Sequence, residues 1–201
     1  PPQDEPRLYV HEMVLEWVYA TPDAVAVVTA SGDVSYADLA RDAVAIARWL
    51  ALQGAGPRAA VACSLPHGYE RLVAQLAVGI CGAALLPIEA YFGPEMLSEL
   101  FGATQPVAAL AASEQLPQLA AVPSLALDSG GGWRDAVLLT AGLVFDDNDQ
   151  HRRAQQLDPG ILSMTSGTTG KPKCVACPTA SYAAAVVSRQ TLFPYRAEAE
   201  R

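Results

Sequence analysis

The sequence has little positive charge and almost no lysine. Its 201 residues include 13 lysines and arginines against 21 aspartates and glutamates, which gives a formal net charge of −8 at pH 7. The only lysines are Lys171 and Lys173, in one short segment. A nucleic-acid-binding domain carries a basic stripe or patch, and this sequence has none, so we expect no nucleic-acid partner. Because both lysines lie in the same short segment, we infer that this segment needs positive charge.

Long apolar runs are also missing. None reaches the roughly 18 residues of a membrane span, because residues such as Arg48 and Gln53 interrupt every candidate. The opening PPQDEPRLYV is polar and acidic, unlike a secretory signal. The composition, 51% hydrophobic and 17% charged, is that of a globular domain or part of one. We therefore expect a cytoplasmic protein with no membrane partner.

Cysteines are few, and they allow two interpretations. The four are Cys63, Cys81, Cys174 and Cys177. The spacing of the last two is that of a redox or metal pair, but a metal site usually needs a second ligand pair, and none is nearby. The small and β-branched residues around them favour a strand. We favour reduced, buried cysteines and leave thiol chemistry open.

Strand and helix patterns alternate over the first two thirds of the chain. The stretch VAVVTASGDVSYADLA predicts a hairpin followed by a helix that Ser35 and Asp38 cap. On that helix the apolar positions run from Leu39 to Leu50, and Asp42 falls off the apolar face. AAVAC, ALLPI, VAAL and SLAL predict buried strands, with helices from Tyr69 and from Pro94 and a weak short helix between the last two strands. This alternation predicts an α/β fold with a largely parallel sheet.

Three segments follow from these patterns. Residues 8–127 form the α/β region, residues 128–158 an irregular loop region, and residues 159–201 a hairpin and a following helix. The middle segment carries an acidic cluster, Asp146, Asp147 and Asp149. The EF-hand spacing and its glycine are absent, which favours a solvated loop over a calcium site.

The segment MTSGTTGKPKC, Met164 to Cys174, lies between two apolar runs and predicts a loop between strands. It is not a Walker loop, because Thr165 replaces the first glycine and Pro172 follows Lys171. Glycines let a backbone approach a ligand closely, and successive N–H groups can form an anion nest. The candidate phosphate-binding residues are Thr165, Ser166, Gly167, Thr168, Thr169, Gly170, Lys171 and Lys173. A polar hairpin turn remains the alternative.

TSGTTGKPK resembles the phosphate-binding signature of the adenylate-forming enzymes, which include the adenylation domains of nonribosomal peptide synthetases, the acyl-CoA synthetases and the luciferases. HEMVLEWVYATPDAVAVV, VSYADLARDAVAIARWL and GICGAALLPIEAYFGPEMLSELFGATQP are similar, in family order, to the opening and first core motifs of the peptide-synthetase branch. The chain is therefore identified as the N-terminal part of an adenylation domain, a ligase of secondary-metabolite biosynthesis.

The resemblance implies ATP-dependent activation of an amino acid to an aminoacyl-adenylate, with Mg²⁺, and transfer to a carrier-protein thiol. No catalytic or metal-binding residue is predicted within this chain, because the family's substrate pocket and catalytic lysine belong downstream and the C-terminal subdomain is absent. We expect the chain alone to be inactive and to bind ATP weakly or not at all. The expected partners are the remainder of the domain, neighbouring synthetase domains, and a second copy meeting an exposed apolar face.

Two departures from the family pattern bear on this prediction. Glu89 stands where an aspartate is usual, and Cys174 stands where the signature has glycine. The alternative is an inactive remnant that serves as a structural or docking module of a synthetase. An unrelated nucleotide-binding protein is a weaker alternative, since three separate segments agree with the family.

Overall fold

The computed structural model describes residues 10–138, 160–165 and 173–178, and five residues between 181 and 189. The first half of the elements comprises α1 (Val10–Ala20), β1 (Val25–Thr29), β2 (Gly32–Ser35), α2 (Tyr36–Leu52), β3 (Ala60–Ser64), α3 (Tyr69–Cys81) and β4 (Ala84–Pro87). The second half comprises α4 (Pro94–Thr104), β5 (Ala108–Ala111), the 3₁₀ helix η1 (Ser113–Leu119), β6 (Ser124–Ala126), α5 (Trp133–Leu138), β7 (Ile161–Thr165) and β8 (Lys173–Cys177).

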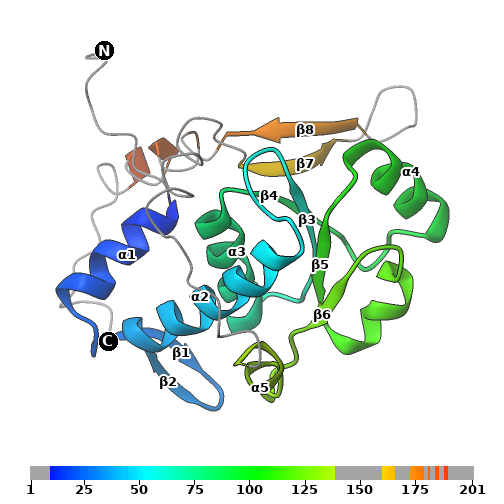
Figure 1. Ribbon diagram of the computed structural model, residues 1–201. Coiled ribbons are helices and arrows are strands. Elements are labelled where there is room, and N and C mark those ends of the chain that lie inside the picture. The colour runs from blue at the N-terminus through cyan, green and yellow to red at the C-terminus, as the bar shows by residue number, and fades with distance from the viewer. Residues whose placement is uncertain are drawn as a thin grey trace.

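The main sheet has six strands in the order β6-β5-β3-β4-β7-β8 (Figure 1). The strands from β6 to β7 run parallel to their neighbours, and β8 returns antiparallel beside β7. A separate antiparallel hairpin is formed by β1 and β2. The predicted α/β fold with a largely parallel sheet is thus confirmed.

Two apolar cores cover the two faces of the sheet. Val61 and Cys63 of β3 belong to the core that α2, α3 and α5 complete, whereas Ala62 between them belongs to the core under α4 and η1. Side chains alternate between faces along a strand, and all five residues of β3 are buried. A strand covered on both faces is mostly apolar, which is why AAVAC reads as a continuous apolar run; Ser64 at the end of β3 is the one buried polar residue of the strand.

The helix α2 begins where its capping pattern predicts. The Ser35 hydroxyl accepts a hydrogen bond from the Asp38 amide at 3.1 Å and donates one to the Asp38 carboxylate at 2.8 Å. Leu39 and Leu50 are buried as predicted. Asp42 is not on the exposed side, however, because it is only 3% exposed. The expectation for Asp42 was wrong, and the reason is a cation supplied from α5.

That helix lies in the segment for which the sequence predicts no regular structure. Residues 133–138 form α5, and its Trp133 and Val137 are buried against the α2 and α3 core. A helix of six residues offers one apolar pair four positions apart, which is too little to register as periodicity. The acidic cluster at residues 146–149 lies outside the described residues.

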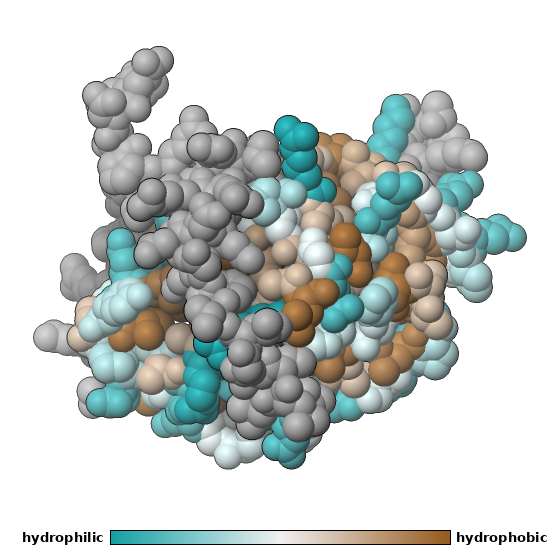
Figure 2. Space-filling view, in the orientation of Figure 1, coloured by the Kyte–Doolittle hydropathy of each residue, from teal (hydrophilic) through white to brown (hydrophobic). Residues whose placement is uncertain are grey.

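Apolar residues on the face drawn in Figure 2 occur in several patches separated by polar ones. The large exposed apolar side chains of the described part include Tyr19, Val28 and Tyr91. None of the described helices has the length and apolar character that a membrane crossing requires.

Candidate functional site

The candidate loop is anchored by a hydrogen-bonded hairpin. Thr165 at the end of β7 pairs with Lys173 at the start of β8, and the Thr165 hydroxyl donates to the Lys173 carbonyl at 3.2 Å. Opposed residues of an antiparallel pair lie about 5 Å apart. The two ends of the loop are therefore held together by the sheet, and both end residues are exposed.

The hairpin places the loop at the carboxyl edge of the parallel sheet. β7 runs parallel to β4, with Ile161 opposite Leu85, so Thr165 and the carboxyl end of β4 point to the same edge. Open α/β sheets bind their ligands outside the carboxyl ends of the strands. The loop thus leaves the sheet at the edge where this architecture places ligand sites.

Two of the eight candidate residues, Thr165 and Lys173, belong to the described part of the chain. The other six lie outside it: Ser166, Gly167, Thr168, Thr169, Gly170 and Lys171. Their assignment to phosphate binding remains a prediction. The flanking strands of the loop are as predicted.

Cys174 and Cys177 are both free and both lie on β8. Residues three apart on a strand point to opposite faces and are separated by about 10 Å. A disulfide needs Cα atoms about 4.4–6.8 Å apart, so these two thiols cannot pair while β8 is intact. No group of three potential metal ligands occurs among the described residues. Partial desolvation raises the pKa of the Cys174 thiol, which disfavours the reactive thiolate. Cys174 is nevertheless exposed, so the expectation of buried cysteines was right for Cys63 and Cys81 and wrong for Cys174.

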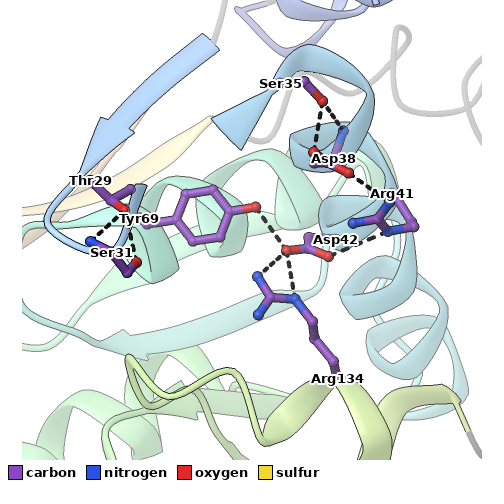
Figure 3. A network of polar contacts seen from close by, with 8 residues as sticks. All are labelled: Thr29, Ser31, Ser35, Asp38, Arg41, Asp42, Tyr69 and Arg134. Carbon is purple, nitrogen blue, oxygen red and sulfur yellow. Dashed lines mark hydrogen bonds and ion pairs between the residues drawn. The ribbon is translucent and has the colours of Figure 1, made fainter. Parts of the chain in front are cut away.

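A polar network around the buried Asp42, which the sequence does not reveal, joins three helices (Figure 3). The Asp42 carboxylate on α2 accepts hydrogen bonds from the Tyr69 hydroxyl at 2.8 Å and from Nε and Nη2 of Arg134 at 2.9 and 2.5 Å. Arg41 lies at the edge of the network, with Nε 3.9 Å from Oδ1 of Asp42. Asp42 therefore connects α2, α3 and α5.

The contacts of the network raise the pKa values of its two donors, Tyr69 and Arg134. The hydrogen bond to Asp42 raises the pKa of Arg134. The pKa of Tyr69 is raised mainly by burial and, to a smaller extent, by its hydrogen bond to Asp42. The Arg134 guanidinium carbon also lies 4.6 Å from the centroid of the Trp133 ring, within cation–π range. Tyr69 and Arg134 thus stay protonated donors at neutral pH, which keeps their hydrogen bonds to Asp42 in place.

The described part of the chain therefore has a parallel sheet with helices on both faces and a hydroxyl- and lysine-bearing hairpin at its carboxyl edge. This is the architecture of an α/β protein that binds ligand beyond the ends of its strands. Comparison with known proteins then identifies the family. Residues 14–200 match the model of the AMP-binding enzyme family, and the chain belongs to that family.

Relatives and solved structures agree with the assignment. The chain is 32% identical over 160 residues to a dimodular nonribosomal peptide synthase of Bacillus subtilis (strain 168), covering 78% of this chain and 7% of that protein. It is 36% identical over 175 residues to phenyloxazoline synthase MbtB of Mycolicibacterium paratuberculosis (strain ATCC BAA-968 / K-10), covering 83% of this chain and 13% of that protein.

The structure of VinN with 3-methylaspartate superposes with a TM-score of 0.74 at 22% identity, covering 94% of this chain and 53% of VinN. That likeness concerns the fold. The chain thus spans about half of VinN and a much smaller share of the two synthases. Its sequence corresponds to an N-terminal portion of an adenylation domain, as the resemblance implies.

Proposed function

We propose that this chain supplies the phosphate-binding part of an adenylation domain that activates an amino acid with ATP and passes the acyl group to a carrier-protein thiol. The observation that carries the proposal is the TSGTTGKPK loop, anchored by the Thr165–Lys173 pair at the carboxyl edge of the sheet. Family membership supports the use of ATP. The names of the relatives support a nonribosomal peptide synthetase as the parent protein.

The donor set of the loop fits a polyphosphate. Backbone N–H groups next to Gly167 and Gly170 can approach the ligand without a Cβ in the way. The threonine hydroxyls add neutral donors, and Lys171 and Lys173 offset the charge of the phosphates. Bound ATP would supply the adenylyl group. The loop residues would position its β- and γ-phosphates, and the lysines would stabilise the negative charge of those phosphates.

The family implies Mg²⁺, and the composition of the loop is consistent with Mg²⁺ that binds together with the nucleotide. The loop contains donors and cations but no carboxylate. Mg²⁺ commonly binds through substrate phosphates plus one or two carboxylates. We infer that phosphate oxygens would hold most of its coordination here, and that any carboxylate ligand comes from outside the loop.

A second candidate is an inactive remnant that serves as a docking or structural module. One observation favours it, namely that Cys174, exposed at the start of β8, stands where the family signature has glycine. A side chain at this position restricts the backbone next to the loop. We expect Cys174→Gly to leave phosphate binding unchanged or to strengthen it. A gain of tenfold or more (about 1.4 kcal/mol) would favour the remnant.

Neighbouring synthetase domains are the proposed partners, because the relatives are multidomain synthetases. A second copy of the chain is a further proposed partner. In the helix predicted after the hairpin, the five described residues are helical and exposed, and they include Ala184 and Ala185.

Location of the ligand tests the proposed function. The isotopically labelled chain is titrated with pyrophosphate, ATP and AMP, and each backbone amide is followed by NMR. We expect saturable shifts within residues 165–173 for pyrophosphate and ATP, and smaller ones for AMP, which lacks the β- and γ-phosphates. The distant amides of β1 and β2 serve as the internal control. Shifts that spread evenly over the chain, or that exclude residues 165–173, would contradict the proposal.

A further inference from the structure

A cavity of about 200 Å³ lies at the carboxyl edge of the sheet, where β3, β4 and β5 end. Its polar lining comprises Ser64, His67, Arg71, Glu89, Glu114 and Gln115. The cavity is separate in sequence from the loop between β7 and β8, and the nucleotide site proposed above uses none of its residues.

The topology explains why a cavity forms here. β3 and β5 are adjacent in the sheet, but α3 after β3 packs on one face and η1 after β5 packs on the other. The two connections diverge and leave a crevice between them. Such switch points are where open α/β sheets bind ligands. The fold therefore provides the space, and the sequence determines its chemistry.

The lining carries opposite charges that are not joined in an ion pair. Among the described residues, no ion pair within 4.0 Å joins Arg71 to Glu89 or Glu114. Nη1 of Arg71 donates to the Leu65 carbonyl at 3.0 Å, which holds the guanidinium against the wall that follows β3. Arg71 is half-buried, whereas both glutamates are exposed.

We propose that this cavity binds a small zwitterion of the amino-acid class, with the carboxylate toward Arg71 and the ammonium toward Glu89 and Glu114. An occupant with charges of both signs satisfies both parts of the lining, whereas a lone anion meets two glutamates and a lone cation meets Arg71. The volume is below the roughly 300–1,000 Å³ of drug-sized ligand sites, so the occupant is small. His67, Ser64 and Gln115 can add neutral hydrogen bonds.

Half-ligands provide the first arm of the test. The labelled chain is titrated with glycine, and separately with acetate and with methylammonium, at constant ionic strength and pH 7. We expect amides within residues 64–67, 88–90 and 112–115 to shift saturably with glycine, with a dissociation constant of about 1 mM or weaker. Each half-ligand should bind about tenfold more weakly. No saturable shift with glycine, or equal binding of either half-ligand, overturns the proposal.

Variants provide the second arm. Arg71→Gln, and Glu89→Gln combined with Glu114→Gln, should each weaken glycine binding by about tenfold, the factor that loss of one well-placed charged contact produces. The control for Arg71 is Arg58→Gln, an exposed arginine before β3 at the opposite edge of the sheet. The control for the glutamates is Glu95→Gln on α4, outside the cavity lining. Neither control should change the affinity.

Arg71→Gln removes the bond to the Leu65 carbonyl and can disturb the β3–α3 connection, whereas the double glutamine variant changes only exposed side chains and keeps the test valid. Glycine binding that is unaffected by the double variant overturns the proposal. Pyrophosphate binding at residues 165–173 should be the same in every cavity variant. Failure of the cavity proposal and failure of the proposed function are therefore separable.

Discussion

Arg134→Met should destabilise the protein because it leaves Asp42, which is remote in sequence, without its cation. The substitution keeps an apolar side chain beside Trp133 but removes the cation that pairs with Asp42. The Asp42 side chain is 4% exposed and that of Arg134 is 43% exposed. The variant therefore leaves a buried carboxylate with the Tyr69 hydroxyl as its main donor.

The magnitude follows from these exposures. Removing one partner of a buried ion pair costs about 3–5 kcal/mol. The partial exposure of Arg134 lets solvent screen the pair, and Tyr69 keeps donating to the carboxylate. We therefore expect the free energy of unfolding to fall by about 2–3 kcal/mol. Arg41→Met is the control, because Arg41 lies at 3.9 Å from the same carboxylate with 67% of its side chain exposed. It should cost less than about 1 kcal/mol.

Urea unfolding, followed by tryptophan fluorescence and by far-ultraviolet circular dichroism, measures both variants. The slope of the free energy against urea should stay constant, so that the midpoint reports stability. Adding Asp42→Asn to Arg134→Met removes the unpaired charge and should restore much of the loss, because replacing both partners costs less than replacing one. Equal stability of Arg134→Met and Arg41→Met, or no recovery when Asp42→Asn is added, would contradict a stabilising Asp42–Arg134 pair.

Three further predictions rest on other contacts. Ser35→Ala removes the cap of α2 and should cost about 1 kcal/mol at pH 7. Ser35 and Arg41 lower the pKa of Asp38 from 3.8, so the stability from ionised Asp38 is present above pH 3.8 and is lost as the pH falls through the lowered pKa. The difference between wild type and variant, measured by urea unfolding, should therefore narrow in acid, and a difference that widens would contradict the cap. A thiol reagent should label the exposed Cys174 in the native protein but label Cys63 and Cys81 only on unfolding. Burial shields Cys63 and Cys81 and raises the pKa of Cys63 to about 11 and that of Cys81 to about 12. Equal labelling rates for all four cysteines would count against this. The chain alone should show no amino-acid-dependent exchange of pyrophosphate into ATP, because its predicted site residues bind phosphate and none is predicted to be catalytic. Exchange above background would contradict that expectation.

Local signals predicted most of the fold. The Ser35–Asp38 cap, the apolar face from Leu39 to Leu50 and the continuous apolar run of β3 each depend on neighbours in sequence, and each appears as predicted. These patterns reflect burial and capping, which a short window contains.

The polar network could not be predicted in this way. Asp42 and Arg134 are 92 residues apart, and α5 is too short to show a period. On its helix Asp42 reads as a solvent-facing acid, because the cation that hydrogen-bonds to it, Arg134, is remote in sequence, whereas the adjacent Arg41 comes only within 3.9 Å. The cavity beyond β3 and β5 was missed for a similar reason, since its lining comes from three connections that only the strand order brings together. The candidate phosphate loop, by contrast, was predicted from a short window, because both lysines of the chain lie within it and TSGTTGKPK resembles a family signature. Its role in phosphate binding remains a prediction.

The central claim is that the lysine-bearing loop is an anion site, and its charge dependence is the most direct test. Pyrophosphate and ATP binding are measured by phosphorus NMR titration for the wild-type chain and for Lys171→Ala combined with Lys173→Ala. Arg152→Ala combined with Arg153→Ala removes the same charge outside the loop and is the control. Wild type should bind with a dissociation constant of about 1 mM, close to −4 kcal/mol. The lysine variant should lose that binding while the arginine variant retains it, and equal binding by the lysine variant and wild type would contradict the claim.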